Sequence, residues 1–158
     1  MLTELVILAV LLDEECTIYR IKKKLDEHFS LFYSASMGSI HPGLKKLYLN
    51  KYVSLKKSTT PGGQRRSTYS ITSPGKKYFE NLMLNSALSE QIVKIKLLIL
   101  PKMEKNLQIS IIKTIKNYYQ DRLLDFENFY ENNPTAYIKQ SINSISEEIS
   151  WLNRQELI

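Results

Sequence analysis

The sequence has a single cysteine, Cys16, among its 158 residues, so it cannot form an internal disulfide or a cysteine-rich metal site. Its longest apolar run, Leu5–Leu12, has eight residues, whereas a membrane-spanning helix needs about 20. No Lys or Arg precedes this run and Asp13-Glu14-Glu15 follows it, which is the reverse of a secretory signal. We therefore expect a cytoplasmic protein with a buried thiol at Cys16.

The sequence also lacks the motifs of the common catalytic and phosphate-binding sites. It contains neither HExxH nor GxSxG, and Gly62-Gly63 is followed by Gln-Arg-Arg rather than by the Lys-Ser/Thr of a phosphate-binding loop. His28 and His41 have no acidic companions at metal-ligand spacing. We therefore expect no enzyme activity, no catalytic residues, no metal site and no cofactor.

Positive charge is abundant, but only in the first half of the chain. Residues 1–80 hold 13 Lys/Arg and 7 Asp/Glu, whereas residues 81–158 hold 9 of each. Between Cys16 and Lys77 there are 13 basic residues and only two acids, Asp26 and Glu27. A basic module joined to a neutral module is typical of a polyanion binder. A solvated, soluble surface is the alternative, and charge alone does not decide between the two.

Hydrophobic periodicity predicts three helices, a hairpin and a fourth helix in the first half. The helices cover roughly Leu2–Leu12, Thr17–Phe29 and the segment from Ser36–Ser39 to about Asn50. Alternating residues 52–57 and 67–72 predict two strands, joined by the turn-rich segment 58–66. The order helix, helix, helix, hairpin, helix is that of a winged helix-turn-helix, whose third helix enters the DNA major groove.

Two segments resemble the PadR-like family of transcriptional regulators. Ser36–Leu47 (SMGSIHPGLKKL) is similar to the family's recognition helix, and Gly62–Gly75 (GGQRRSTYSITSPG) is similar to its wing. The resemblance covers about half of the chain and implies a DNA-binding regulator. Three positions depart from the family pattern: His41 replaces an aromatic residue, and Ile18 and Lys51 replace glycines.

The helix pattern and the resemblance together predict the DNA-contacting side chains. Ser39, His41 and Lys45 are candidates for base contacts, with Tyr48 as a helper. The cations of the third helix and the wing are candidates for phosphate contacts. The complete predicted set is Ser36, Ser39, His41, Lys45, Lys46, Tyr48, Lys56, Lys57, Arg65 and Arg66.

The second half is predicted to be entirely helical, with a long helix to about Asn132 and a last helix after Pro134. Both carry narrow apolar stripes that need a partner, either each other or a second chain. A two-fold homodimer is the commonest solution and would match a palindromic operator. The predicted dimerisation residues are Leu107, Ile111, Ile115, Tyr118, Ile138, Ile142, Ile145, Ile149 and Leu152.

The fold class predicted for the whole chain is mostly α. Residues 1–80 are expected to form the winged helix-turn-helix domain, and residues 81–158 a helical dimerisation domain. Some family members sense small aromatic ligands, so Tyr118, Phe126 and Trp151 are a possible effector pocket; ordinary helix packing is the alternative. We expect a repressor that binds double-stranded DNA. The alternative function is a winged-helix scaffold that binds an acidic protein partner.

Overall fold

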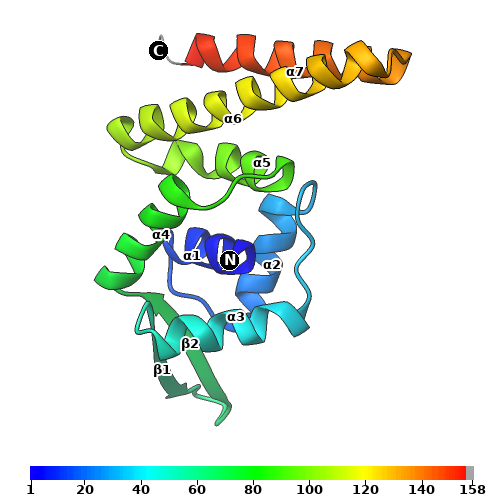
Figure 1. Cartoon of the computed structure of the whole chain (residues 1–158). Helices are drawn as coiled ribbons and strands as arrows, with labels where there is room; N and C mark the ends of the chain where they lie inside the picture. Colours follow the sequence, from blue (N-terminus) through cyan, green and yellow to red (C-terminus); the bar gives the residue numbers. More distant parts are fainter. Residues whose placement is uncertain (156–158) are drawn as a thin grey trace. The chain divides into compact units, whose positions relative to one another are not determined.

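The computed structural model describes residues 1–155, and the chain divides into two compact units, Met1–Ile99 and Leu100–Ile158. The first unit contains the helices and the hairpin labelled in Figure 1 as α1 (Leu2–Leu11), α2 (Ile18–Phe29), α3 (Met37–Leu49), β1 (Val53–Thr59), β2 (Arg65–Ile71), α4 (Ser73–Asn85) and α5 (Glu90–Ile99). The described part of the second unit contains the 3₁₀ turn η1 (Leu100–Lys102), α6 (Lys105–Asn132) and α7 (Ala136–Gln155). This element order confirms the predicted fold class: three helices and a two-stranded wing, followed by C-terminal helices.

Helix α1 is the centre of the first unit. Residues Leu5–Leu11 are each at most 3% exposed, because α2, α3, α4 and α5 all pack against this helix. A helix that is apolar on every side needs cover on every side, and here four helices supply it. The first compact unit thus includes all of α4, which continues to Asn85, and α5. The domain boundary expected at residue 80 stays a prediction.

Local sequence rules explain where the next two helices begin. Thr17 caps α2 by accepting a hydrogen bond from the Arg20 N–H. Ser36 and Ser39 form a reciprocal capping box at the start of α3. Pro42 lies in the second turn of α3, where its missing N–H leaves the carbonyl of the residue four positions earlier without a helical donor.

A Schellman motif ends α3. The N–H of Lys51 donates to the Tyr48 carbonyl at 2.9 Å, and the N–H of Tyr52 donates to the Leu47 carbonyl at 2.9 Å. This geometry places Lys51 at φ 61°, in the left-handed region that favours glycine. The family pattern has a glycine at this position, and the left-handed backbone conformation found here is one that glycine adopts without strain.

The wing is a twisted antiparallel hairpin in which Val53 pairs with Ile71 and Thr59 pairs with Arg65. Its strands are longer than predicted, since pairing continues to residues 59 and 65 and leaves only residues 60–64 for the turn. The Thr60 N–H donates to the Gln64 carbonyl at 2.8 Å, and Gly63 takes φ 80°. At the base of the wing, Tyr69 of β2 also exchanges two backbone hydrogen bonds with Cys16, at 2.8 and 3.0 Å.

Helices α6 and α7 form a hairpin in the second unit and pack along each other. Of the predicted dimerisation residues, Ile111, Ile115, Ile145 and Leu152 are buried within one chain, and the other five are half-buried. Their assignment to an interface between two chains stays a prediction. Within residues 1–155, none of the helices combines the length and apolar character needed to cross a bilayer.

Candidate nucleic-acid interface

A groove of about 510 Å³ runs between the outer face of α3 and the base of the wing. His41, Lys45 and Tyr48 line it from α3, while Leu55 and Tyr69 line it from the two strands of the hairpin. The inner stripe of α3, residues Ile40, Leu44 and Leu47, is at most 1% exposed, so the outer stripe is turned to solvent by necessity. The structure thus brings together three of the predicted DNA-contacting residues.

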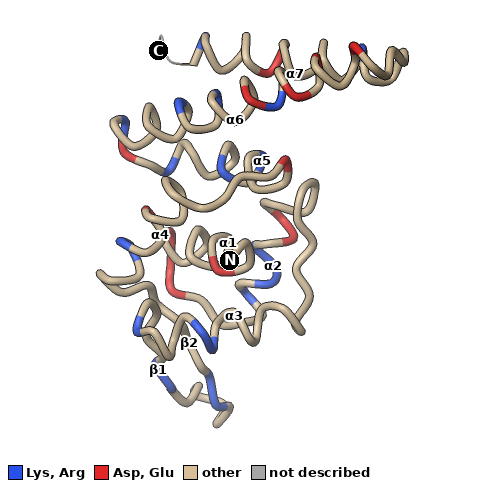
Figure 2. Tube along the Cα trace, viewed as in Figure 1, with Lys and Arg blue, Asp and Glu red and all other residues tan. Residues whose placement is uncertain are grey.

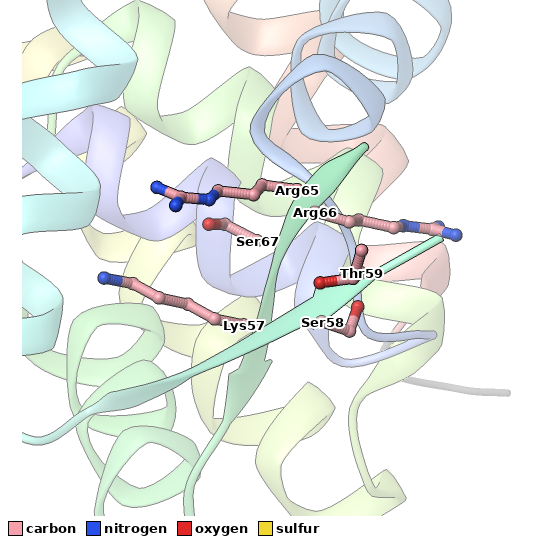
Figure 3. Close-up of a pocket in the computed structure, with 6 residues that line it drawn as sticks. All are labelled: Lys57, Ser58, Thr59, Arg65, Arg66 and Ser67. Carbon is pink, nitrogen blue, oxygen red and sulfur yellow. The ribbon is translucent and has the colours of Figure 1, made fainter. Parts of the chain in front are cut away.

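The hairpin has two chemically distinct faces because side chains alternate along each strand. Lys57 and Arg65 share the face of Leu55 and Tyr69, which is the face that lines the groove. Lys56 and Arg66 lie on the opposite face, among small hydroxyl-bearing residues. Figure 3 shows Lys57 and Arg65 extending to one side of the hairpin and Arg66 to the other. The four wing cations predicted as one set are therefore two pairs with different orientations.

The positive charge of α2 is largely compensated within the chain. Arg20 and Lys24 both form ion pairs with Glu14, and the carboxylate's hydrogen bonds with Lys24 and Arg20 lower the pKa of Glu14. Two further pairs run along the helix at four-residue spacing, Lys22 with Asp26 and Lys23 with Glu27. The excess of basic residues in the sequence of α2 is therefore not an excess of free cations.

The cations of α3 and the wing are different. Figure 2 shows basic but no acidic positions along α3, β1 and β2. Among residues 1–155, no ion pair forms at five of the predicted cations: Lys45, Lys56, Lys57, Arg65 and Arg66. The uncompensated charge is thus concentrated on α3 and the wing, where a polyanion can meet it.

Three other predicted contacts have roles inside the protein. The Ser36 and Ser39 hydroxyls hold the capping box, and Ser39 also donates to the Ser36 carbonyl at 2.9 Å. Lys46 donates to the Glu4 carboxylate at 2.7 Å. Sequence reasoning missed Glu4, which is 4% exposed; the available signal was a lone acid at the start of an otherwise apolar helix.

Burial and hydrogen bonding act on the Glu4 carboxyl in opposite directions. Burial raises its pKa, but hydrogen bonds from Lys46, Tyr78 and the Met1 amino group outweigh that effect, and the net pKa lies below its ordinary value. Burial, together with the hydrogen bond that its hydroxyl donates to Glu4, raises the pKa of Tyr78 to about 12. Glu4 is therefore a charged acceptor at neutral pH, and Tyr78 is a neutral donor.

The predicted effector residues lie on α6 and α7. The guanidinium of Arg122 lies over the rings of Tyr118 and Phe126, at 5.7 and 5.2 Å from their centroids. Trp151, on α7, is 38% exposed. Within residues 1–155 there is no group of three or more His, Cys, Asp or Glu side chains arranged to hold a metal ion.

Comparison with known proteins finds similar solved structures and one family model. No curated protein matches the chain. Among solved structures, Bacillus subtilis PadR in complex with operator DNA is 16% identical, with 98% of this chain and 96% of that chain covered, at a TM-score of 0.48. The same protein in complex with p-coumaric acid is 17% identical, with 99% and 98% covered, at 0.46.

The winged helix carries the sequence similarity. The smu.1704 protein of Streptococcus mutans is 30% identical over 51% of this chain and 72% of its own, at a TM-score of 0.44. The model of the transcriptional regulator PadR-like family matches residues 7–81, which run from α1 into α4. Through this winged helix, the chain belongs to the transcriptional regulator PadR-like family.

Proposed function

We propose that this regulator is a sequence-specific repressor that binds a palindromic operator as a homodimer. The observation that carries the proposal is the groove between α3 and the base of the wing, which Lys45 lines, together with Lys57 and Arg65 further along the same face of the hairpin. None of the three cations forms an ion pair within residues 1–155. Unpaired cations at the groove and along the adjoining face of the hairpin favour a ligand with regularly spaced negative charges, such as a DNA backbone.

Each wall has a separate task in the proposed complex. The outer stripe of α3 enters the major groove, where His41, Lys45 and Tyr48 reach base edges and the Lys45 ammonium also neutralises a flanking phosphate. The wing follows the flanking backbone, where Lys57 and Arg65 neutralise phosphates. Because phosphate contacts position the protein and base contacts specify the sequence, the two sets predict different losses on mutation.

A homodimer is proposed from the second unit. Helices α6 and α7 leave several large apolar side chains exposed, among them Ile109, Leu124, Phe129 and Tyr137 at 45–76%. A second copy of the same surface is the commonest cover for such side chains. It would set two recognition helices about 34 Å apart, one turn of DNA. Sedimentation tests this directly: a particle of one 18.4 kDa chain would contradict the dimer.

The function is tested by selecting bound duplexes from a random pool and then measuring affinity for the selected site by fluorescence anisotropy at several salt concentrations. We expect a palindromic consensus and a logarithmic salt slope that loses about 0.9 for each phosphate contact removed. The double variant Lys57→Gln/Arg65→Gln should lower the slope by about 1.8. The matched control is Lys76→Gln/Lys77→Gln, which removes two exposed cations of α4 that do not line the groove.

Two outcomes would refute the proposal. One is a pool that yields no enriched sequence, with affinity equal to that for random DNA. The other is a salt slope that the groove variant and the control variant change equally. Either result would favour the alternative of a scaffold that binds an acidic protein through the same basic surface.

We further propose a small planar aromatic effector that binds near Tyr118, Phe126 and Trp151. Arg122 between the two α6 rings offers a cation and two aromatic faces in one place. The sequence has one tryptophan, so tryptophan fluorescence, excited selectively over that of the tyrosines, reports on Trp151 alone. Titration with p-coumaric acid, the compound bound in the Bacillus subtilis structure, should quench that fluorescence and weaken operator binding. Unchanged fluorescence and unchanged operator affinity would reject this compound as effector.

A further inference from the structure

Glu4 joins three helices of the first unit. It lies in the first turn of α1, is 4% exposed and is followed directly by the apolar core residues Leu5–Leu11. The Lys46 ammonium donates to its Oε1 at 2.7 Å, and the Tyr78 hydroxyl donates to its Oε2 at 2.8 Å. One carboxylate thus connects α1 to the recognition helix α3 and to α4.

The same network reaches both strands of the wing at its base. The ring of Tyr78 stacks on that of Tyr52, with centroids 4.2 Å apart and planes inclined by 11°. Tyr52 directly precedes β1, and its carbonyl accepts a hydrogen bond from the N–H of Thr72 at 3.0 Å, while the Thr72 hydroxyl donates to the carbonyl of the preceding residue, Lys51, at 2.7 Å. Thr72 directly follows β2. A continuous series of contacts therefore runs from Lys46 to the base of the hairpin, where β1 begins and β2 ends.

Stability alone does not account for a charge at this position. Removing a carboxylate from water costs free energy that an ion pair recovers only in part, and apolar replacements of buried pairs are often as stable. Hydrogen bonds to a carboxylate are directional, however, whereas apolar contacts are not. The Glu4 network thus supplies a fixed geometry between elements that apolar packing alone holds less strictly.

We propose that Glu4, acting through Lys46 and Tyr78, is a positioning residue that sets the angle between α3 and the wing. This positioning role rests on the proposed function, because the angle between α3 and the wing defines the groove that receives DNA. Lys46, whose side chain is 60% exposed, then pairs with Glu4 and not with the phosphates, in contrast to its neighbour Lys45, which lines the groove.

The test compares two adjacent lysines. Lys46→Met removes the ammonium and keeps the apolar stem, and Lys45→Met is the matched control on the groove side. We expect Lys46→Met to weaken binding to the selected operator about tenfold while the salt slope and the affinity for random DNA stay unchanged. Lys45→Met should lower the salt slope by about 0.9 on both DNAs. Lys46→Arg, which retains a cation for Glu4, should restore most of the operator affinity.

Two results would overturn the proposal: a fall in salt slope for Lys46→Met equal to that for Lys45→Met, or unchanged operator affinity. Glu4→Gln should reproduce the Lys46→Met phenotype. If Glu4→Gln does not fold, Lys46→Met still decides, because it leaves the Tyr78 hydrogen bond in place.

A second readout needs no DNA. Amide hydrogen exchange of Lys46→Met should be faster than wild type at the end of α3 and at Tyr52, with the global free energy of unfolding retained. Exchange equal to wild type in both segments would refute the positioning role. A wild-type chain that fails to bind DNA would refute the proposed function, and the exchange pattern would still decide the role of Glu4.

Discussion

Arg65 and Arg66 are adjacent in the chain and lie on opposite faces of the same hairpin, with Arg65 on the face of Tyr69 and the groove. Arg65→Gln should therefore weaken DNA binding about fivefold and lower the salt slope by about 0.9. Arg66→Gln should leave both quantities close to wild type. Fluorescence anisotropy with the selected operator, repeated at several salt concentrations, measures the difference.

The pair Lys57 and Lys56 provides an independent control for the same alternation. Lys57→Gln should behave like Arg65→Gln, and Lys56→Gln like Arg66→Gln. If all four variants lose equal slope, the wing does not present one face to the backbone. The assignment of the groove as the DNA site would then be wrong.

Gly38 is exposed in the first turn of α3, and packing does not require glycine there. A Cβ at this position would meet Ser36 Oγ at 3.5 Å, an ordinary contact. Gly38→Ala should stabilise the helix by about 0.5–1 kcal/mol. It should nevertheless weaken operator binding about tenfold, because the added methyl group keeps the helix backbone away from the bases. Thermal denaturation and anisotropy on the same sample separate the two effects.

Gly43, one turn further along α3, is the contrasting case. Its Cβ would lie 3.1 Å from Ile7 Cδ1 and 3.2 Å from Thr3 Cγ2 on α1. Gly43→Ala should therefore lower stability by about 1 kcal/mol through crowding of the core. Equal effects of the two substitutions on stability and on binding would contradict the close approach of Gly38 to DNA.

Lys51 holds a left-handed conformation that glycine adopts without strain. Lys51→Gly should raise the free energy of unfolding by about 1 kcal/mol, since relief of strain exceeds the added entropy of the unfolded chain. Urea denaturation measures the change. Asn50→Gly is the control: Asn50 has φ −83°, so glycine there should only destabilise. A loss of stability in Lys51→Gly would contradict the strain.

Lys96 on α5 is 1% exposed, and its Nζ has no hydrogen-bond partner among residues 1–155. Burial lowers the pKa of Lys96 to about 8, from an ordinary value of 10.5. The unfolded chain therefore binds more protons between these values, so stability should rise with pH across this window and fall as the pH drops towards 8. Lys96→Met should remove that dependence and stabilise the chain at about pH 7 by roughly 1–3 kcal/mol.

Denaturation at about pH 7 and about pH 9.5 tests this prediction, and both values lie below the range in which Tyr78 titrates. Tyr78 has the opposite effect on the pH dependence of stability. Because its pKa is raised in the folded chain, the stability that it contributes is lost as the pH rises from about 10 to about 12. A wild-type chain whose stability falls between about pH 7 and about pH 9.5 would contradict the burial of a charged Lys96.

Much of the first unit could be predicted because its signals are local. The Thr17 and Ser36 caps depend on residues three positions away, and the alternation of the hairpin depends on residues two positions away. The end of the hairpin was less predictable, since the Thr60–Gln64 hydrogen bond that closes the turn depends on the paired strands already being in register.

The residue types at the candidate site could be predicted from the sequence, but the ion-pair partners of the individual side chains could not. Lys45 and Lys46 look alike in sequence, and only the fold brings Glu4, 42 residues away, to one of them. Composition likewise counts the α2 cations as free, although Glu14, which precedes that helix, forms ion pairs with two of them. Such pairings join segments that are distant in the chain, and a single sequence carries no periodic signal for them.

The backbone bridge between Cys16 and Tyr69 gives the wing an uneven stiffness. At Tyr69, β2 is hydrogen-bonded on both edges, whereas towards residues 60–64 its hydrogen bonds are only to β1. The hairpin is thus held most firmly at its base, and its tip is the part that bends most easily. A duplex that widens or narrows a groove will displace the tip most, and the strand register at Val53 and Ile71 will stay unchanged.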